Sequence, residues 1–192
     1  MLDVRAVAPT LDQILTFCAE DPVERVFLED IARRGLGRFS ALERDGLLTA
    51  LCHVGANVVP SGTGCALFAD AAAHREEIGI DPLRRDRDGF RWRTRAQIEE
   101  GRSWIWLEDG VIHFKAEASA WTPAAVQLQQ VWVDPSVRGR GNAKRAMRDL
   151  CRLLLERVPT VCLFVRPENA PALRVYEGIG MQRTINYRSL IF

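Results

Sequence analysis

The chain has 192 residues, and 47% of them are hydrophobic, which is enough for a globular protein to bury its own core. Its 26 basic side chains are nearly balanced by 25 acidic ones, so no overall field favours nucleic acid or an anionic membrane surface as a partner. Because no apolar run reaches 18 residues and the amino terminus lacks the design of a signal peptide, we expect a soluble cytoplasmic protein.

The first sixty residues are expected to form two helices and three strands. Hydrophobic alternation indicates the strands, and apolar residues three or four positions apart indicate the helices. In chain order the elements are a strand over 2–7, helices over 11–19 and 21–34, and strands over 39–42 and 47–52. Thr10 is placed to cap the first helix, and Asp21-Pro22-Val23-Glu24 to open the second. Arg44-Asp45-Gly46 predicts a hairpin turn between the two later strands.

The rest of the chain is expected to begin with a linker and to continue as a second set of helices and strands. The linker is Ser61-Gly62-Thr63-Gly64, because small and flexible residues cluster there. The elements after it are helix 66–75, a charged loop over 84–88, helix 91–100, strands 104–107, 111–121 and 126–133, helix 141–157, strand 160–165, helix 170–177 and strand 185–192. Asp109-Gly110 is the strongest hairpin signal in the chain.

A basic loop with two glycines separates the strand over 126–133 from the helix over 141–157. Glycines let the backbone approach an anion closely, and the free amides of the first helical turn point at it. Arg138 and Arg140 add positive charge at the same place. A two-glycine loop alone is more often an ordinary turn, and the spacing fits neither a Walker loop nor a dinucleotide fingerprint. The loop is therefore a candidate phosphate site that needs support from the rest of the chain.

Two ordered motifs give that support. Arg138-x-x-Gly141-x-Ala143 resembles the (Gln/Arg)-x-x-Gly-x-(Gly/Ala) signature of the GNAT acetyltransferases. Downstream, Asn169-x-x-Ala172-x-x-x-Tyr176 followed by Gly180-Met181 is similar to the carboxy-terminal motif of the same family, with Met181 in place of the usual phenylalanine. Methionine can fill the same apolar position. The resemblance covers roughly residues 90–192.

The resemblance implies an α+β GNAT fold, with a mixed central sheet that is flanked by helices and splayed to admit the pantetheine arm of acetyl-CoA. Acetyl-CoA would be the co-substrate. The implied cofactor-binding residues are Val131, Trp132 and Val133 for the arm, Arg138, Gly139, Arg140, Gly141, Asn142 and Ala143 for the pyrophosphate, and Asn169 for the arm again. Tyr176 would donate a proton to the departing thiolate. Without the motif, Tyr176 would be an ordinary packed aromatic, and Asn169 can be a helix cap in either case.

The general base is harder to assign. Where some relatives carry a glutamate on the strand before the loop, this chain has glutamines, whose amides cannot accept the proton. Glu117, on the strand after the Asp109-Gly110 turn, is the nearest carboxylate, with Glu108 and Glu168 behind it. Most carboxylates on strands are only paired or solvent-facing, so the base stays a hypothesis.

A metal site is not expected. His53, His74 and His113 are widely separated and have no cysteine or carboxylate partners at ligand spacing. The five cysteines are scattered without a CxxC pair, which indicates buried free thiols.

The amino-terminal half repeats elements that normally open a GNAT domain. The chain therefore resembles bacterial proteins in which a GNAT-like half without a cofactor loop precedes a catalytic domain. We divide it into an N-terminal GNAT-like α/β segment, residues 1–74, and a catalytic domain, residues 75–192. We expect the early strands to complete or extend the sheet of the catalytic half, so that both halves share one core.

The implied activity is transfer of an acetyl group from acetyl-CoA to an amine by direct attack in a ternary complex. Polyamine-like, aminoglycoside-like and protein N-terminal amines all remain open as acceptors, as does pairing into a homodimer. One alternative is a non-catalytic acyl-CoA-binding regulatory module, whose amino-terminal segment forms a partner interface. Another is a sensor that binds a different phosphorylated ligand in the same loop.

Overall fold

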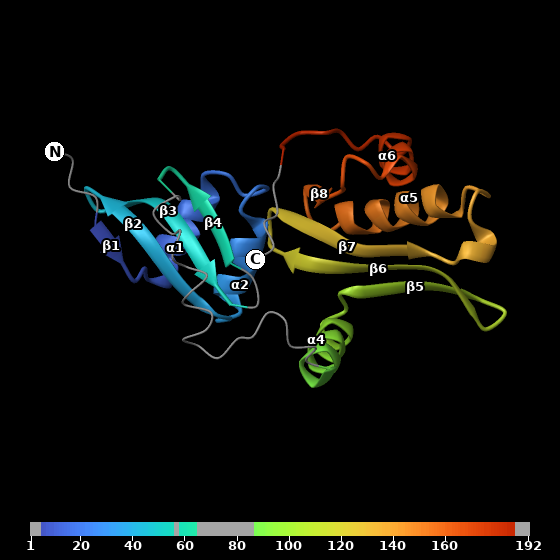
Figure 1. The fold of residues 1–192 in the computed structure, drawn as a ribbon, viewed down its shortest axis with the longest axis horizontal. Coiled ribbons are helices and arrows are strands. Elements are labelled where there is room, and N and C mark those ends of the chain that lie inside the picture. The colour runs from blue at the N-terminus through green and yellow to red at the C-terminus, as the bar shows by residue number, and fades with distance from the viewer. Residues whose placement is uncertain (1–4, 56–57, 65–86, 187–192) are drawn as a thin grey trace. The chain divides into compact units, whose positions relative to one another are not determined.

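The computed structural model describes residues 5–55, 58–64 and 87–186. The chain divides into two compact units, one formed by residues 1–91 with 120–124 and the other by 92–119 with 125–192. The described strands form two four-stranded sheets, in the orders β1-β2-β3-β4 and β5-β6-β7-β8 (Figure 1). No helix in the described ranges is both long and apolar enough to span a bilayer.

The first unit packs two helices with an antiparallel sheet. Its elements are β1 (Arg5–Val7), α1 (Leu11–Ala19), α2 (Val26–Arg33), β2 (Arg38–Arg44), β3 (Leu47–Val54) and β4 (Val58–Gly62). Ile14, Phe17 and Cys18 of α1 are buried in one cluster with Leu51 of β3. Burial raises the pKa of the Cys18 thiol to about 12, so this cysteine is a neutral core residue at ordinary pH.

Several predictions for the first unit are confirmed. Thr10 caps α1, because its side chain accepts from the amide of Gln13 while the Gln13 side chain accepts from the amide of Thr10. The turn between β2 and β3 places Asp45 at φ 51° and Gly46 at φ 81°, as a tight hairpin requires.

Two predictions for the first unit are wrong. The second helix begins at Val26, not at Asp21. Arg25 takes φ −95° and ψ 11°, which is not a helical conformation, so it occupies the N-cap position just before the helix. Asp21 still accepts the amide of Glu24, but in a turn. Gly62 belongs to β4 and not to a linker, since it pairs with Ala50. A Cβ on Gly62 would lie 2.5 Å from the carbonyl of Thr49, so close packing explains this glycine.

The second unit is built on a mixed sheet. Its elements are α4 (Arg87–Glu99), β5 (Ser103–Glu108), β6 (Val111–Trp121), β7 (Ala125–Val133), a 3-10 turn η2 (Pro135–Val137), α5 (Asn142–Leu155), β8 (Thr160–Leu163) and α6 (Ala170–Glu177). β5 and β6 are antiparallel, whereas β7 and β8 are parallel. Figure 1 draws α4 and α5 on opposite sides of these strands. The predicted α+β class with a mixed sheet is confirmed.

Most element boundaries of the second unit agree with the sequence analysis. β6 and α6 have the predicted bounds, and α5 is capped by Gly141 with Met147, Leu150 and Leu154 buried. Arg87 and Asp88 lie in α4, where a charged loop was expected. β8 ends at Leu163, two residues early, and Ile185 is not in a strand. The predicted helix over 66–75, the boundary between 74 and 75, and residues 187–192 lie outside the described residues.

Candidate functional site

The parallel strands β7 and β8 separate part of the way along the sheet. Their pairing runs from Ala125 opposite Thr160 to Leu128 opposite Leu163. β8 ends there, but β7 continues for five more residues to Val133. The predicted arm-binding residues Val131, Trp132 and Val133 therefore lie beyond the last position at which β7 pairs with β8. Trp132 is 39% exposed.

A β-bulge in β7 marks the start of this separation. Gln130 has φ 51°, in the left-handed region that non-glycine residues rarely adopt. β6 contacts β7 on both sides of this residue, since the hydroxyl of Ser119 donates to the carbonyl of Gln127 at 3.1 Å and the amide of Asp134 donates to the carbonyl of His113 at 3.1 Å. A left-handed residue inside a paired strand is typical of a bulge.

The loop after β7 is folded back onto the end of the strand. Arg138 donates from Nε to the carbonyl of Val133 at 3.0 Å, and Asn142 donates from Nδ2 to the carbonyl of Val137 at 3.2 Å. At the start of the loop Asp134 accepts from the amide and hydroxyl of Ser136, and these hydrogen bonds lower the pKa of Asp134. The loop is therefore held in place by its own side chains.

The same loop presents backbone amides at the start of α5. Gly139 has φ 76° and Gly141 has φ 79°, and a Cβ built on either would meet nothing within 4 Å. Gly141 is the N-cap of a helix of 14 residues. The first amides of a helix have no partner inside it, and they carry the positive end of the helix dipole. With Arg140 exposed beside them, this geometry suits a phosphate group.

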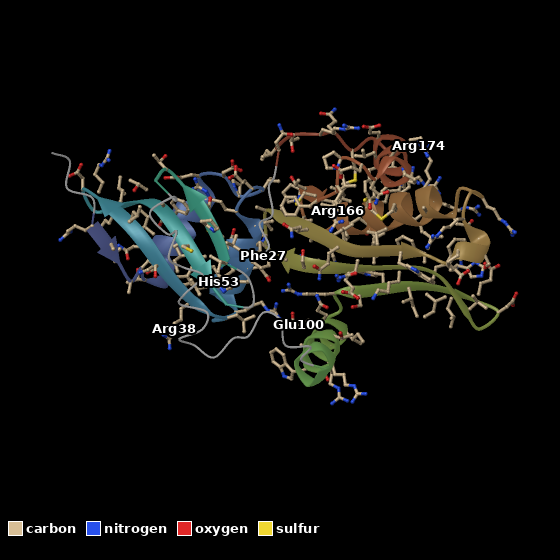
Figure 2. The ribbon with its side chains drawn as sticks, in the orientation of Figure 1. Phe27, Arg38, His53, Glu100, Arg166 and Arg174 are labelled. Atoms are coloured by element: carbon tan, nitrogen blue, oxygen red, sulfur yellow. The ribbon has the colours of Figure 1, made fainter. Side chains whose placement is uncertain are left out.

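Helix α6 carries the two remaining motif residues, Asn169 and Tyr176. Asn169 is its N-cap and accepts the amide of Ala172 at 3.3 Å, so the predicted capping role is confirmed. Tyr176, in the last turn, is half-buried. Burial, and secondarily Cys151 of α5, raise the pKa of this phenol above its ordinary value of 10.0. Arg166 and Arg174, labelled in Figure 2, add two exposed cations along the segment from β8 to α6.

Glu117 lies on β6 and is already engaged in an ion pair. Its Oε1 is 2.6 Å from Nζ of Lys115, two residues earlier on the same strand face. Glu117 lies two residues before Ser119 on β6, and the hydroxyl of Ser119 contacts Gln127 of β7. Because β6 is the neighbour of β7 in the sheet, the carboxylate lies on the strand next to the one that carries Val131 to Val133.

The other candidates for the base lie elsewhere. Glu108, at the far end of β5, has Oε2 3.7 Å from Nδ1 of His113, and Glu168 is exposed before α6. Gln127 is buried and donates from Nε2 to Ser119 at 2.7 Å. Within the described ranges there is no group of three or more acidic, histidine or cysteine side chains that could hold a metal ion.

Two features of the site were missed by sequence reasoning. Lys115 could have been found, because the Lys-x-Glu spacing on a predicted strand places both side chains on one face. The bulge at Gln130 has no such signal, since glutamine has no preference for positive φ.

Comparisons with known proteins were made for the whole chain. A family model described as the acetyltransferase (GNAT) family matches residues 66–181. Two curated relatives are both named mycothiol acetyltransferase. The one from Brachybacterium faecium is 34% identical over 103 residues, covering 46% of this chain and 31% of the relative, and the one from a Nocardioides species is 32% identical over 99 residues, covering 50% and 33%. The chain thus spans about a third of the length of these relatives.

Solved acetyltransferases are also similar. An acetyltransferase from Clostridium acetobutylicum, solved with acetyl-CoA, is 20% identical with a TM-score of 0.46 and covers 66% of this chain and 88% of that one. AAC(6')-Iy, in complex with a bisubstrate analogue, is 24% identical with a TM-score of 0.45 and covers 57% and 84%. Because both TM-scores lie below 0.5, family membership rests on the sequence match over residues 66–181.

Proposed function

The chain belongs to the acetyltransferase (GNAT) family, and from that premise we propose that it transfers an acetyl group from acetyl-CoA to an amine. One observation carries the proposal. The basic glycine loop at the start of α5 lies against the end of β7, at the place where β7 has separated from β8. A diphosphate on the loop would therefore have an extended arm running beside the end of β7, beyond the last residue that pairs with β8.

Acetyl-CoA fits the residues at this place. The amides and cations of Arg138, Gly139, Arg140, Gly141, Asn142 and Ala143 would hold the pyrophosphate. The backbone of Val131, Trp132 and Val133 would pair with the pantetheine arm, with Asn169 as a further contact. The open space around the two loop glycines supports this fit, because a ligand can approach the backbone without meeting a side chain.

The reaction needs one proton acceptor and one proton donor. The ammonium group of the amine substrate would lose a proton to Glu117. The neutral amine would then attack the thioester carbonyl to form the C–N bond. As the C–S bond breaks, the thiolate would take a proton from the phenol of Tyr176. Burial supports this role of Tyr176, because it raises the pKa of the phenol and so favours the protonated form that can donate.

A second function is favoured by one observation. Glu117 is paired with Lys115 at 2.6 Å, so its carboxylate is not free to take a proton until that pair rearranges. A module that binds acyl-CoA without turnover would have no need of a free base. Turnover distinguishes this regulatory function from the enzyme.

The test combines calorimetry with a thiol-release assay over an amine panel. We expect the Kd for acetyl-CoA to rise at least ~10-fold in Arg138→Ala, because a charge-assisted contact is lost. We expect Tyr176→Phe to keep that Kd and to lose ~100-fold in kcat, the usual effect of a general acid. Arg152→Ala, an exposed cation on α5, is the matched control and should change neither quantity.

The pH profile of kcat gives an independent readout for Tyr176. Because burial raises its pKa, the phenol is the donor below that pKa and is lost as pH rises through it. The alkaline decline of kcat should therefore lie at a higher pH than an ordinary phenol would give, and it should be absent from the residual rate of Tyr176→Phe. Absence of acetyl-CoA binding would refute the proposal, and binding without turnover on any amine would favour the regulatory module.

A further inference from the structure

The ion pair on β6 has one buried and one accessible partner. The Glu117 side chain is 11% exposed, whereas that of Lys115 is 40% exposed. Across the strand pair, Glu117 lies opposite Ser103 and Lys115 opposite Ile105. Ile105 is itself 58% exposed, so the described strands leave the lysine end of this face open to solvent. A small molecule can therefore reach the pair from the side of Lys115.

Neither Lys115 nor Glu117 lines the apolar groove of the second unit. Trp104, Trp106 and Phe114 line this cavity of about 370 Å³ with α5, and Ile105 is also among its lining residues. The face that carries Lys115 and Glu117 continues along β6 to Ser119, whose hydroxyl donates to the carbonyl of Gln127 on β7. The pairing of β7 with β8 ends at Leu128, so this face lies one strand away from the proposed place of the acetyl-CoA arm.

We propose that the acceptor is a 2-amino acid, whose amine is held by Glu117 and whose carboxylate is held by Lys115. This inference rests on the proposed function and names its substrate class. Two opposite charges 2.6 Å apart match a molecule that carries an ammonium and a carboxylate on one carbon. Inserting the zwitterion exchanges one internal ion pair for two pairs with the ligand, so neither protein charge is left unpaired.

The same arrangement disfavours acceptors with several amines. A polyamine or an amino sugar brings a second cation and no carboxylate, and that cation would face the Lys115 ammonium. Its amine would also break the internal pair without giving Lys115 a new partner, which leaves a charge uncompensated. Lys115 is therefore the residue that selects the charge class of the acceptor.

The experiment compares each of a set of amino acids with its own primary carboxamide, using the whole chain and saturating acetyl-CoA. The two members share the amine and side chain and differ only in the carboxylate charge. We expect the KM of the amino acids to be at least ~10-fold lower, as a charge-assisted contact gives. Diamines of similar size should be poorer acceptors than the amino acids.

Variants assign the preference to Lys115. Lys115→Met should raise the KM of amino acids ~10-fold without raising that of carboxamides, because carboxamides give Lys115 no partner, and Lys115→Arg should restore most of the preference. Arg152→Met removes an exposed cation elsewhere and should leave the preference unchanged. Thermal unfolding and acetyl-CoA affinity show whether each variant is folded.

The outcomes separate this inference from the proposed function. A native protein that acetylates carboxamides and diamines as well as amino acids overturns the inference and leaves the proposed function standing. An undiminished preference for amino acids in folded Lys115→Met also overturns it. If Lys115→Met does not fold, two measurements decide between the outcomes. They are the preference of the native protein for amino acids over carboxamides and the retention of that preference in Lys115→Arg. A protein that binds acetyl-CoA but acetylates no amine overturns both.

Discussion

The two glycines of the loop before α5 combine a demanding backbone conformation with open space. Gly139 and Gly141 have φ of 76° and 79°, and the conformational cost to an L-residue there is about 1–2 kcal/mol. No neighbouring atom would obstruct a side chain at either position. The positive φ therefore explains glycine at these positions, and the open space around them is consistent with the proposed approach of a ligand.

Gly141→Ala tests this reading, with Gly110→Ala as its matched control. Gly110 has φ 76° in the β5–β6 hairpin and equally open surroundings, so both changes should cost about 1–2 kcal/mol of unfolding free energy. Only Gly141→Ala should weaken acetyl-CoA binding, by ~10-fold or more, because it turns the first amides of α5 and adds a methyl group beside them. Chemical denaturation and calorimetry measure the two quantities.

Equal affinities in the two variants would mean that the loop does not hold the anion. A loss of affinity in both variants would show that the affinity for acetyl-CoA depends on stability alone.

At the scale of elements, α6 is a short helix, and the position of its side chains depends on its N-cap residue, Asn169. Its eight residues run from Ala170 to Glu177, with Asn169 bonded to the amide of Ala172. A helix this short has little stability of its own. Tyr176 lies in its last turn, so the cap at one end helps to fix the phenol at the other.

Asn169→Ala should therefore lower both stability and kcat. Loss of an N-cap costs about 1 kcal/mol, and a loosened α6 would place Tyr176 less accurately. Thr10→Ala removes the cap of α1 in the other unit and should give a similar loss of stability with kcat unchanged. Denaturant unfolding and the thiol-release assay provide the measurements.

Asn169→Ser separates the capping role of this residue from its proposed contact with the pantetheine arm. Serine can cap α6, but its side chain is too short to reach as far as asparagine. Recovery of kcat in Asn169→Ser, together with a KM for acetyl-CoA above that of the native protein, would support an arm contact as well. If Thr10→Ala lowers kcat as much as Asn169→Ala, the effect is not specific to α6.

At the scale of the whole molecule, the first compact unit is built from two separated pieces of chain, residues 1–91 and 120–124. The second piece joins β6 to β7, and in it Ala120 and Thr122 are buried. A break between residues 74 and 75 therefore removes most of one unit and leaves a buried part of it behind. A shared core of the two halves remains our proposal.

We expect residues 75–192, expressed alone, to have a lower free energy of unfolding than the whole chain and a weaker affinity for acetyl-CoA. Both losses follow if buried residues such as Thr122 lose the unit they belong to. Denaturant unfolding and calorimetry on the two proteins make the comparison. A fragment that unfolds cooperatively and binds acetyl-CoA as tightly as the whole chain would refute the shared core.

The sequence by itself determined the features that depend on neighbours along the chain. The capping box at Thr10, the hairpin turns at Asp45-Gly46 and Asp109-Gly110, and α5 with its N-cap Gly141 all use local hydrogen bonds and local backbone preference. The candidate anion loop belongs to this group, since its glycines, its cations and the helix amides that follow are contiguous. Its motif could therefore be read before any fold was known.

Only the tertiary structure decided the features that depend on partners remote in sequence. The residue pattern predicts a linker at Gly62, but this glycine pairs with β3 as part of β4 and packs closely against Thr49. The bulge at Gln130 and the early end of β8 at Leu163 depend on pairing among β6, β7 and β8. No residue type in the sequence predicts either feature. The residue pattern predicted the candidate anion loop, whereas strand pairing over long separations decided which residues of β7 lie beyond the end of β8.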